Sequence, residues 1–365
     1  MAASEHYGAA SAAVLRLLGC EKPILQAPMA GTSSPALAAE VCAAGGLGAL
    51  GLGAMNAEAA ARAIAETRAR TDQPFHVNLF CHEHAPPDPQ HDAEWLELLA
   101  PLFADFGAEP PARLNEIYQS FKTDEAMLSM LLETRPAVVS FHFGLPSAEK
   151  IAALKGAGIR LLASATQPHE AEAVAAAGLD AVIAQGWEAG GHRGIFEPDG
   201  PDSRLGVFAL VQLLARTSPI PVIAAGGIMD GAGVAAALKL GAGAAQLGTA
   251  YVGCPESLAD AGHRQALREA ARRPTALTAA ISGRPARCLA NRFTAFGAEI
   301  PAHEIAAYPY AYDAGKALNA AAKAKGEAGY GPHWAGQGAP LAREMGARAL
   351  TLKLAEELAA AWRDL

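Results

Sequence analysis

Short apolar runs recur along the chain, and each is followed by a polar or glycine-marked turn and then by an alanine-rich stretch of helical length. Eight such runs occur, at residues 23–26, 46–52, 75–79, 137–141, 159–163, 180–184, 221–224 and 244–247. Strands buried on both faces read as continuous apolar runs, and their alternation with helices requires parallel pairing with right-handed crossovers. The pattern therefore predicts an α/β fold, a closed (β/α)8 TIM barrel.

Two regions interrupt this rhythm. Residues 81–122 are rich in Pro, His and Asp and contain a helical piece near residues 94–106, which predicts an insertion after the third strand. Beyond residue 282 the pattern becomes helical and loop-like, which predicts a cap subdomain over 283–340. A helix from about Leu341 then packs back on the barrel within 341–365. Residues 15–80 and 123–282 make up the barrel itself. A separate carboxy-terminal domain is the alternative, although no flexible linker precedes it.

Composition narrows the functional class. The 365 residues carry 37 acidic and 29 basic side chains, a net charge of −8 that leaves little room for a nucleic-acid-binding surface. With 51% hydrophobic and 18% charged residues, the chain can bury a sizeable core. The amino terminus lacks the pattern of a secretory signal, and no long apolar run predicts a membrane span. We expect a soluble, cytoplasmic protein, a monomer or homodimer, without nucleic-acid or membrane partners.

Cysteine and histidine spacing gives no sign of a metal site. The five cysteines stand far apart and form no C-x-x-C pair, so neither a zinc site nor a disulfide framework is indicated. His82, His84 and His91 lie among acidic residues, but Pro86, Pro87 and Pro89 are expected to break any helix that would align them, and a solvated loop is favoured. The G-x-G-x-x-G pattern at residues 46–51 lies within an apolar run rather than at a strand-to-helix turn, which argues against a dinucleotide site.

Polar and glycine residues follow the apolar runs, at the strand ends where TIM barrels place their active sites. Asn78 ends the third run, His142 the fourth and Gln185 the sixth. The seventh and eighth runs end in glycine-rich loops at 226–227 and 248. Loops at these two places commonly hold a phosphate, because glycine lets backbone N–H groups approach it. A phosphorylated cofactor or substrate is predicted, and the alternative is that these glycines only make tight turns.

Six segments at these strand ends resemble the nitronate monooxygenase family, also called 2-nitropropane dioxygenase. They lie at residues 26–48, 77–80, 140–144, 185–194, 224–228 and 246–249, in the expected order over most of the chain. The most specific is AGGHRG at residues 189–194. The later segments YPYAY at 308–312, with Lys316, and WAGQ at 334–337 resemble the class I branch of the family.

The resemblance implies that the barrel binds FMN. It places the flavin and its phosphate on Ala27, Pro28, Met29, Asn78, Gln185, Gly190, Gly226, Gly227, Gln246, Leu247, Gly248 and Thr249. The first three can supply a flat apolar wall for the flavin ring, and the amides can supply directed hydrogen bonds. For Asn78 and Gln185 the alternative is a structural role, in which a buried amide satisfies backbone groups.

The resemblance also makes His192 the catalytic residue, able to hydrogen-bond a nitronate oxygen. It places the substrate against His142, Tyr308, Tyr312 and Lys316. A lysine there suits a carboxylated substrate such as propionate 3-nitronate, and an ordinary surface lysine is the alternative. The implied reaction transfers one electron from the nitronate to FMN and uses O2 to form a carbonyl compound plus nitrite or nitrate. Since a nitronate is already a carbanion equivalent, no strong base is required.

Two other functions remain open at this point. FMN-dependent NAD(P)H reductases, including enoyl-[acyl-carrier-protein] reductase and quinone reductase, share the barrel and a similar Gly-Gly-His string. A flavin-binding protein that has lost turnover is the non-enzymatic alternative, although His192 and the tyrosines at 308 and 312 argue against it.

Overall fold

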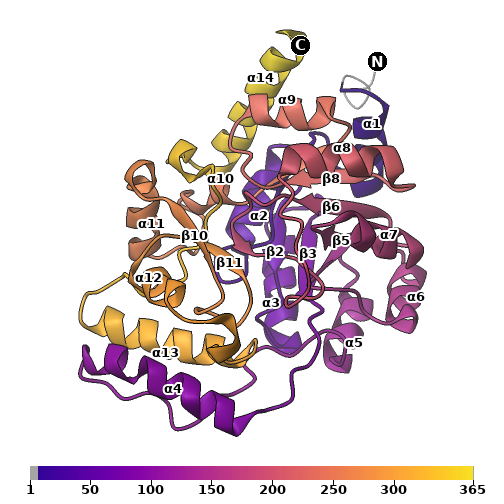
Figure 1. Cartoon of the computed structure of the whole chain (residues 1–365). Coiled ribbons are helices and arrows are strands. Elements are labelled where there is room, and N and C mark those ends of the chain that lie inside the picture. Colours follow the sequence, from indigo (N-terminus) through magenta and orange to yellow (C-terminus); the bar gives the residue numbers. More distant parts are fainter. Residues whose placement is uncertain (1–6, 365) are drawn as a thin grey trace.

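Parallel strands surrounded by helices form the centre of the molecule (Figure 1). The computed structural model describes residues 7–364. The strands of the central sheet are β1 (Ile24–Gln26), β2 (Ala49–Gly51), β3 (His76–Phe80), β4 (Val138–His142), β5 (Arg160–Ala165), β6 (Ala181–Gln185), β8 (Val222–Ala225) and β9 (Ala244–Leu247). They are hydrogen-bonded in the order β1-β9-β8-β6-β5-β4-β3-β2, and every pairing is parallel. Each of the eight predicted runs overlaps one of these strands.

The helices that accompany the barrel alternate with its strands. They are α1 (Ala9–Leu18), α2 (Pro35–Ala43), α3 (Ala57–Arg68), α5 (Glu125–Thr134), α6 (Ala148–Gly156), α7 (Pro168–Ala176), α8 (Val207–Thr217), α9 (Gly231–Lys239) and α10 (Thr249–Val252). Several begin at a side chain that accepts a hydrogen bond from the first turn, such as Ser34, Asn56 and Ser147. At these helices the capping side chain marks where the helix begins.

The ring closes next to β2. A parallel bridge joins Leu25 to Leu47, two residues ahead of that strand, and Gln26 N donates to Leu47 O at 2.9 Å. Gly48 is required at this point because a Cβ there would collide with the backbone of Ala38 in α2. The glycines of the 46–51 stretch therefore serve close packing of the barrel, and the predicted TIM barrel is confirmed.

A small antiparallel sheet lies against the barrel. It consists of β10 (Thr275–Thr278), β11 (Ala286–Leu289) and the two-residue strand β7 (Gly191–His192), in the order β10-β11-β7. The helical and loop-like pattern predicted beyond residue 282 is therefore incomplete, because a hairpin spans that position. Helices α11 (Ala261–Arg268), α12 (Arg292–Ala298) and α13 (Tyr310–Ala324) surround this sheet, and short 3-10 turns occur at Ala270–Arg272, Ala302–Glu304 and Ala339–Leu341.

The helix in the 81–122 segment is longer than predicted. It is α4 (Pro89–Ala104), and Asp88 accepts a hydrogen bond from His91 N at its start. Pro89 occupies the first turn, where the missing N–H is no loss, and residues 81–88 before it form no helix, so no helix aligns His82 and His84 with His91, as expected. Figure 1 shows α4 alongside α13, and the two helices share an apolar cluster that includes Trp95 and Leu318.

The carboxy-terminal helix begins later than predicted. It is α14 (Ala347–Asp364) rather than a helix from Leu341, and it packs against α9 and α2. Glu357 accepts the backbone N–H of Gly231 at 3.1 Å, which ties α14 to the start of α9. Among the helices of residues 7–364, none combines the length and apolar character needed to cross a membrane. The division into barrel, insertion, cap and final helix remains a prediction.

Candidate active site

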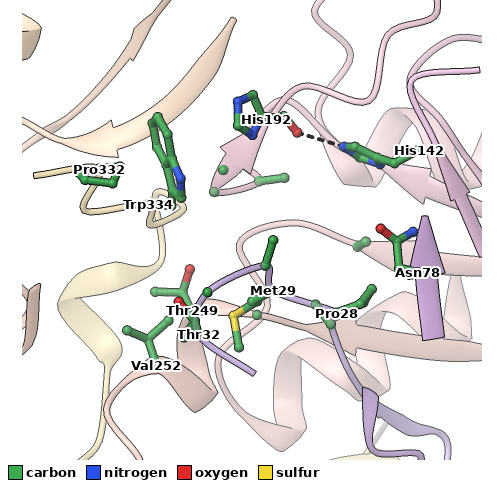
Figure 2. A pocket seen from close by; sticks show the side chains of 18 of the residues that line it. Pro28, Met29, Thr32, Asn78, His142, His192, Thr249, Val252, Pro332 and Trp334 are labelled. Carbon is green, nitrogen blue, oxygen red and sulfur yellow. Dashed lines mark hydrogen bonds between the residues drawn. The ribbon is translucent and has the colours of Figure 1, made fainter. Parts of the chain in front are cut away.

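A cavity of about 550 Å³ opens at the carboxyl ends of the barrel strands. Predicted site residues that line it are Ala27, Pro28, Met29, Asn78, His142, Gln185, Gly190, His192, Gly226, Gly227, Gln246, Gly248, Thr249, Tyr312 and Lys316. Figure 2 shows Pro28 and Met29 on one side and His192 with Trp334 on the other. Two predicted residues do not line it. Leu247 is buried in the barrel core, and Tyr308 lies behind the wall, 5.8 Å from the His192 ring.

Glycines allow the 189–194 segment to pass between the barrel and the 334–337 segment. A Cβ on Gly190 would clash with the backbone N of Gly336, and a Cβ on Gly194 would lie 2.7 Å from the His142 ring. Gly191 has a φ of 72°, which glycine adopts without strain. The glycines of the AGGHRG segment are therefore required because neighbouring backbone and side-chain atoms leave no room for a Cβ at Gly190 and Gly194.

The conformation of His192 is set by the small sheet. His192 pairs with Ala286 of β11, and its carbonyl accepts hydrogen bonds from Gln185 Nε2 at 3.0 Å and His142 Nε2 at 3.2 Å. Its ring Nε2 lies 2.9 Å from Ser282 Oγ. The ring is surrounded by aromatic side chains, with the Trp334 ring centre 5.2 Å away and the Tyr312 ring centre 5.9 Å away. This packing fixes the imidazole at the cavity wall.

Gln185 organises the same segment. Its Nε2 donates to His192 O, and its Oε1 accepts from Gly194 N at 2.7 Å. Next to it, Arg193 donates to both carboxylate oxygens of Asp202 at 2.8 and 2.9 Å and to Gln185 O at 2.8 Å. Both side-chain contacts of Gln185 are thus with backbone groups, as in the structural role given above as the alternative to flavin binding.

His142 and His192 are both uncharged at neutral pH. Burial, together with the nearby His142 and Arg284, lowers the pKa of His192 to about 3. Burial likewise lowers the pKa of His142 to about 4. His142 Nε2 faces a carbonyl, so it carries the hydrogen, and its Nδ1 accepts from Ser164 Oγ at 2.9 Å. Neutral imidazoles at these positions donate and accept hydrogen bonds without adding charge.

Asn78 lies at the cavity edge of β3. Its Nδ2 donates to Ser140 Oγ at 2.7 Å and to Ser140 O at 3.2 Å, across the β3–β4 pairing. These two contacts fix the amide plane, and the side-chain oxygen of Asn78, Oδ1, has no hydrogen-bond partner among the described residues. The residue is therefore anchored by its amide nitrogen and leaves an acceptor toward the cavity.

The loops after β8 and β9 form another part of the wall. Gly226 and Gly227 have φ angles of 123° and 69°, a backbone region that L side chains rarely adopt. Gln246 Oε1 is buried without a hydrogen-bond partner among the described residues. Thr249 Oγ1 accepts from Gly336 N at 2.9 Å, which joins this loop to the 334–337 segment.

Lys316 lies at the mouth of the cavity. Its Nζ sits 4.6 Å from the centre of the Tyr118 ring and 5.5 Å from that of Tyr312. The side chain is largely exposed, and partial burial lowers its pKa. No carboxylate of the described residues forms an ion pair with it. Asp313 is near enough to raise the pKa of Lys316 but forms no salt bridge with it, so the ammonium at this position favours an anion.

Sequence reasoning missed six polar or aromatic residues of the wall. Tyr118 comes from the 81–122 segment, which carried no motif. His263 and His333 stack with ring centres 5.3 Å apart, and Asp260 begins α11 beside them. Ser140 and Ser164 were visible as strand-end residues, but only the three-dimensional pairing reveals that they hold Asn78 and His142.

Comparisons with known proteins agree with this geometry. A family model described as nitronate monooxygenase matches residues 11–357. The chain is 64% identical over 346 residues to a nitronate monooxygenase of Paraburkholderia phytofirmans, covering 95% of this chain and 94% of the relative. It is 55% identical over 345 residues to a nitronate monooxygenase of Pseudomonas aeruginosa, covering 94% of this chain and 98% of the relative.

A solved structure is similar throughout. The nitroalkane oxidase from Streptomyces ansochromogenes superposes with a TM-score of 0.87 at 42% identity, and the match covers 97% of this chain and 100% of that one. The barrel, the cavity at its strand ends and the resemblance along nearly the whole sequence lead to one assignment. The chain belongs to the nitronate monooxygenase family, a family of flavin-dependent oxidoreductases.

Proposed function

We propose that this protein is an FMN-dependent nitronate monooxygenase that oxidises alkyl nitronates with O2. The observation that carries the proposal is the cavity wall itself, in which the neutral His192 and the unpaired ammonium of Lys316 line the same space. Hydrogen-bond donors and a cation suit an anionic substrate that needs no further deprotonation.

The residues present fit FMN. Gly226 and Gly227 leave backbone N–H groups without side chains in front of them, as a phosphate site requires. The buried Gln246 Oε1 lacks a partner, and the ribityl hydroxyls of FMN can donate to it. Ala27, Pro28 and Met29 supply an apolar wall for the flavin ring, and Asn78 offers an acceptor at its edge. In this assignment Leu247 contributes through its backbone rather than its side chain.

Bound FMN would supply the electron acceptor for oxidation of the nitronate. The chain's own residues then bind and orient the substrate. His192 would hydrogen-bond a nitronate oxygen, and His142 would hold the His192 backbone in place through its carbonyl. A histidine whose pKa is about 3 is a weak base, so it does not remove the carbon-bound proton of a nitroalkane efficiently. We therefore propose the nitronate, rather than its parent nitroalkane, as the preferred substrate.

We propose propionate 3-nitronate as a good substrate because it carries a carboxylate as well as the nitronate. Lys316, held between Tyr118 and Tyr312, would pair with that carboxylate at the cavity mouth. Tyr308, one layer behind, would support the His192 ring instead of touching substrate.

The direct test is to purify the protein, record its visible spectrum and measure oxygen uptake with propionate 3-nitronate and with its parent nitroalkane, 3-nitropropionate. A yellow protein that consumes oxygen with the nitronate, and much more slowly with the nitroalkane, is the expected result. A colourless protein without oxygen uptake would refute the proposal. His192→Asn should retain the yellow colour and lose most of the turnover, whereas unchanged turnover would remove its assigned role.

A further inference from the structure

One ring nitrogen of His192, Nε2, has a defined partner in the protein. Nε2 lies 2.9 Å from the hydroxyl of Ser282, a residue with no exposed surface in the turn between β10 and β11. Nδ1 has no hydrogen-bond partner among the described residues, so it is the nitrogen available to a ligand in the cavity. The role of His192 at the cavity thus depends on which nitrogen carries the hydrogen.

The contacts of Ser282 indicate which ring nitrogen of His192 carries the hydrogen. Its hydroxyl has one hydrogen and two acceptors within reach, His192 Nε2 at 2.9 Å and Arg284 O at 3.2 Å. The backbone N–H of Arg284 approaches the same oxygen at 3.5 Å. The 2.9 Å distance to Nε2 is shorter than the 3.2 Å distance to Arg284 O, which favours a hydroxyl hydrogen directed at Nε2 over the alternative in which Nε2–H donates to Oγ and the hydroxyl donates to Arg284 O. A short chain results, from Arg284 N–H to Ser282 Oγ–H to His192 Nε2.

His142, which also lines the cavity, has the same kind of contact with a serine. His142 must donate from Nε2, since that atom faces the His192 carbonyl, and Ser164 must then donate to its Nδ1. A buried serine that donates to a neutral imidazole, and so fixes its tautomer, is therefore already present 22 residues from His142 along the sequence.

We propose that Ser282 is a positioning residue: it donates to Nε2 of His192 and thereby keeps the ring hydrogen on Nδ1, toward the cavity. This inference rests on the proposed function, because it explains how His192 can donate to an anionic nitronate oxygen. With the opposite tautomer, the Nδ1 lone pair would face the nitronate oxygen and repel it.

The tautomer can be measured directly on the flavin-loaded protein. We would label histidine with ¹⁵N and record long-range ¹H–¹⁵N correlation spectra, with His192 identified by the signal that is lost in His192→Asn. The expected spectrum of the unaltered protein shows a protonated Nδ1 and an unprotonated, hydrogen-bonded Nε2. A protonated Nε2 in the unaltered protein overturns the proposal without the need for any further variant.

Variants then test the role of the hydroxyl. Ser282→Ala should shift the His192 signals toward the other tautomer and lower kcat/KM for propionate 3-nitronate about 10- to 100-fold, the value of one hydrogen bond to a charged group. Ser282→Thr, which retains a hydroxyl, should restore both. Tyr251→Phe, which removes another buried hydroxyl bond at 2.8 Å to Thr351 outside the cavity, should change neither.

The two proposals fail in different ways. If the unaltered protein has the predicted tautomer and Ser282→Ala changes it, but no nitronate is oxidised, the proposed function is wrong and the positioning role stands. If nitronate is oxidised but Ser282→Ala leaves both the His192 signals and kcat/KM unchanged, the positioning role is wrong and the proposed function stands.

Discussion

Replacement of Lys316 by methionine should separate substrates by charge. The substitution removes the ammonium and keeps a flexible apolar stem of similar length against Tyr118 and Tyr312. Propionate 3-nitronate, with its additional carboxylate, should lose efficiency, and propyl 1-nitronate, which lacks that carboxylate, should not. The prediction follows from the position of Lys316 at the cavity mouth, without a salt bridge to any of the described residues.

The size of the effect lies between two limits. An exposed ion pair contributes about 0.2–1 kcal/mol, and a hydrogen bond to a charged group that is removed from water contributes about 1.5–3 kcal/mol. Lys316 is largely exposed in the free protein and would be covered in part by the substrate. We therefore expect a loss of about 1–2 kcal/mol, which corresponds to about 5- to 30-fold in kcat/KM.

The assay is oxygen uptake with both nitronates, on proteins of equal flavin content. Lys325→Met, at an exposed position just beyond the same helix α13, is the matched control and should behave like the unaltered protein. Because the pKa of Lys316 is lowered, the preference for the carboxylated substrate should also decline with rising pH before an ordinary lysine would titrate. Equal losses for the two substrates, or no loss for either, would refute the reasoning.

Three further outcomes are expected. Since burial holds the pKa of His192 at about 3, kcat/KM for a nitronate should show no break near pH 6.5, and a pH–rate step there would contradict this prediction. The unfolding free energy should fall as the pH drops from about 6.5 toward 3, because in that range only the unfolded chain binds the proton at this histidine. Gly190→Ala should lower bound flavin and Tm, at a cost of about 1–3 kcal/mol, because its Cβ meets Gly336; full flavin content and unchanged Tm would count against the packing argument. Asp202→Asn should lower the unfolding free energy by about 3–5 kcal/mol in denaturant titrations, because it leaves the buried Arg193 without its carboxylate. A change under 1 kcal/mol would mean that the Arg193–Asp202 ion pair does not stabilise the fold.

Much of the barrel could be predicted because local sequence and final environment agree there. Strands such as β4 and β6 are buried on both faces, so their apolar runs appear directly in the sequence. The small sheet could not be predicted in the same way. Its strand β7 has only two residues, and its pairing with β11 joins segments almost a hundred positions apart.

The site was predictable where glycine and strand-end position carry information. His192 and Asn78 lie at the cavity because a parallel barrel brings all strand ends to one rim. Tyr118 and Ser282 were missed because their roles depend on how the 81–122 segment and the β10–β11 turn fold over that rim. Tyr308 was placed one layer too far forward, since a motif match gives proximity to the site but not the direction of a side chain.

The central claim is that a flavin in this cavity is reduced by a nitronate and not by a nicotinamide. The most direct measurement is anaerobic stopped-flow mixing of the flavin-loaded protein with propionate 3-nitronate and, separately, with NADH and NADPH, while the visible flavin absorbance is followed. We predict rapid loss of oxidised-flavin absorbance with the nitronate and almost none with either nicotinamide. Rapid bleaching by NADH or NADPH, without a response to the nitronate, would contradict the account and identify a reductase.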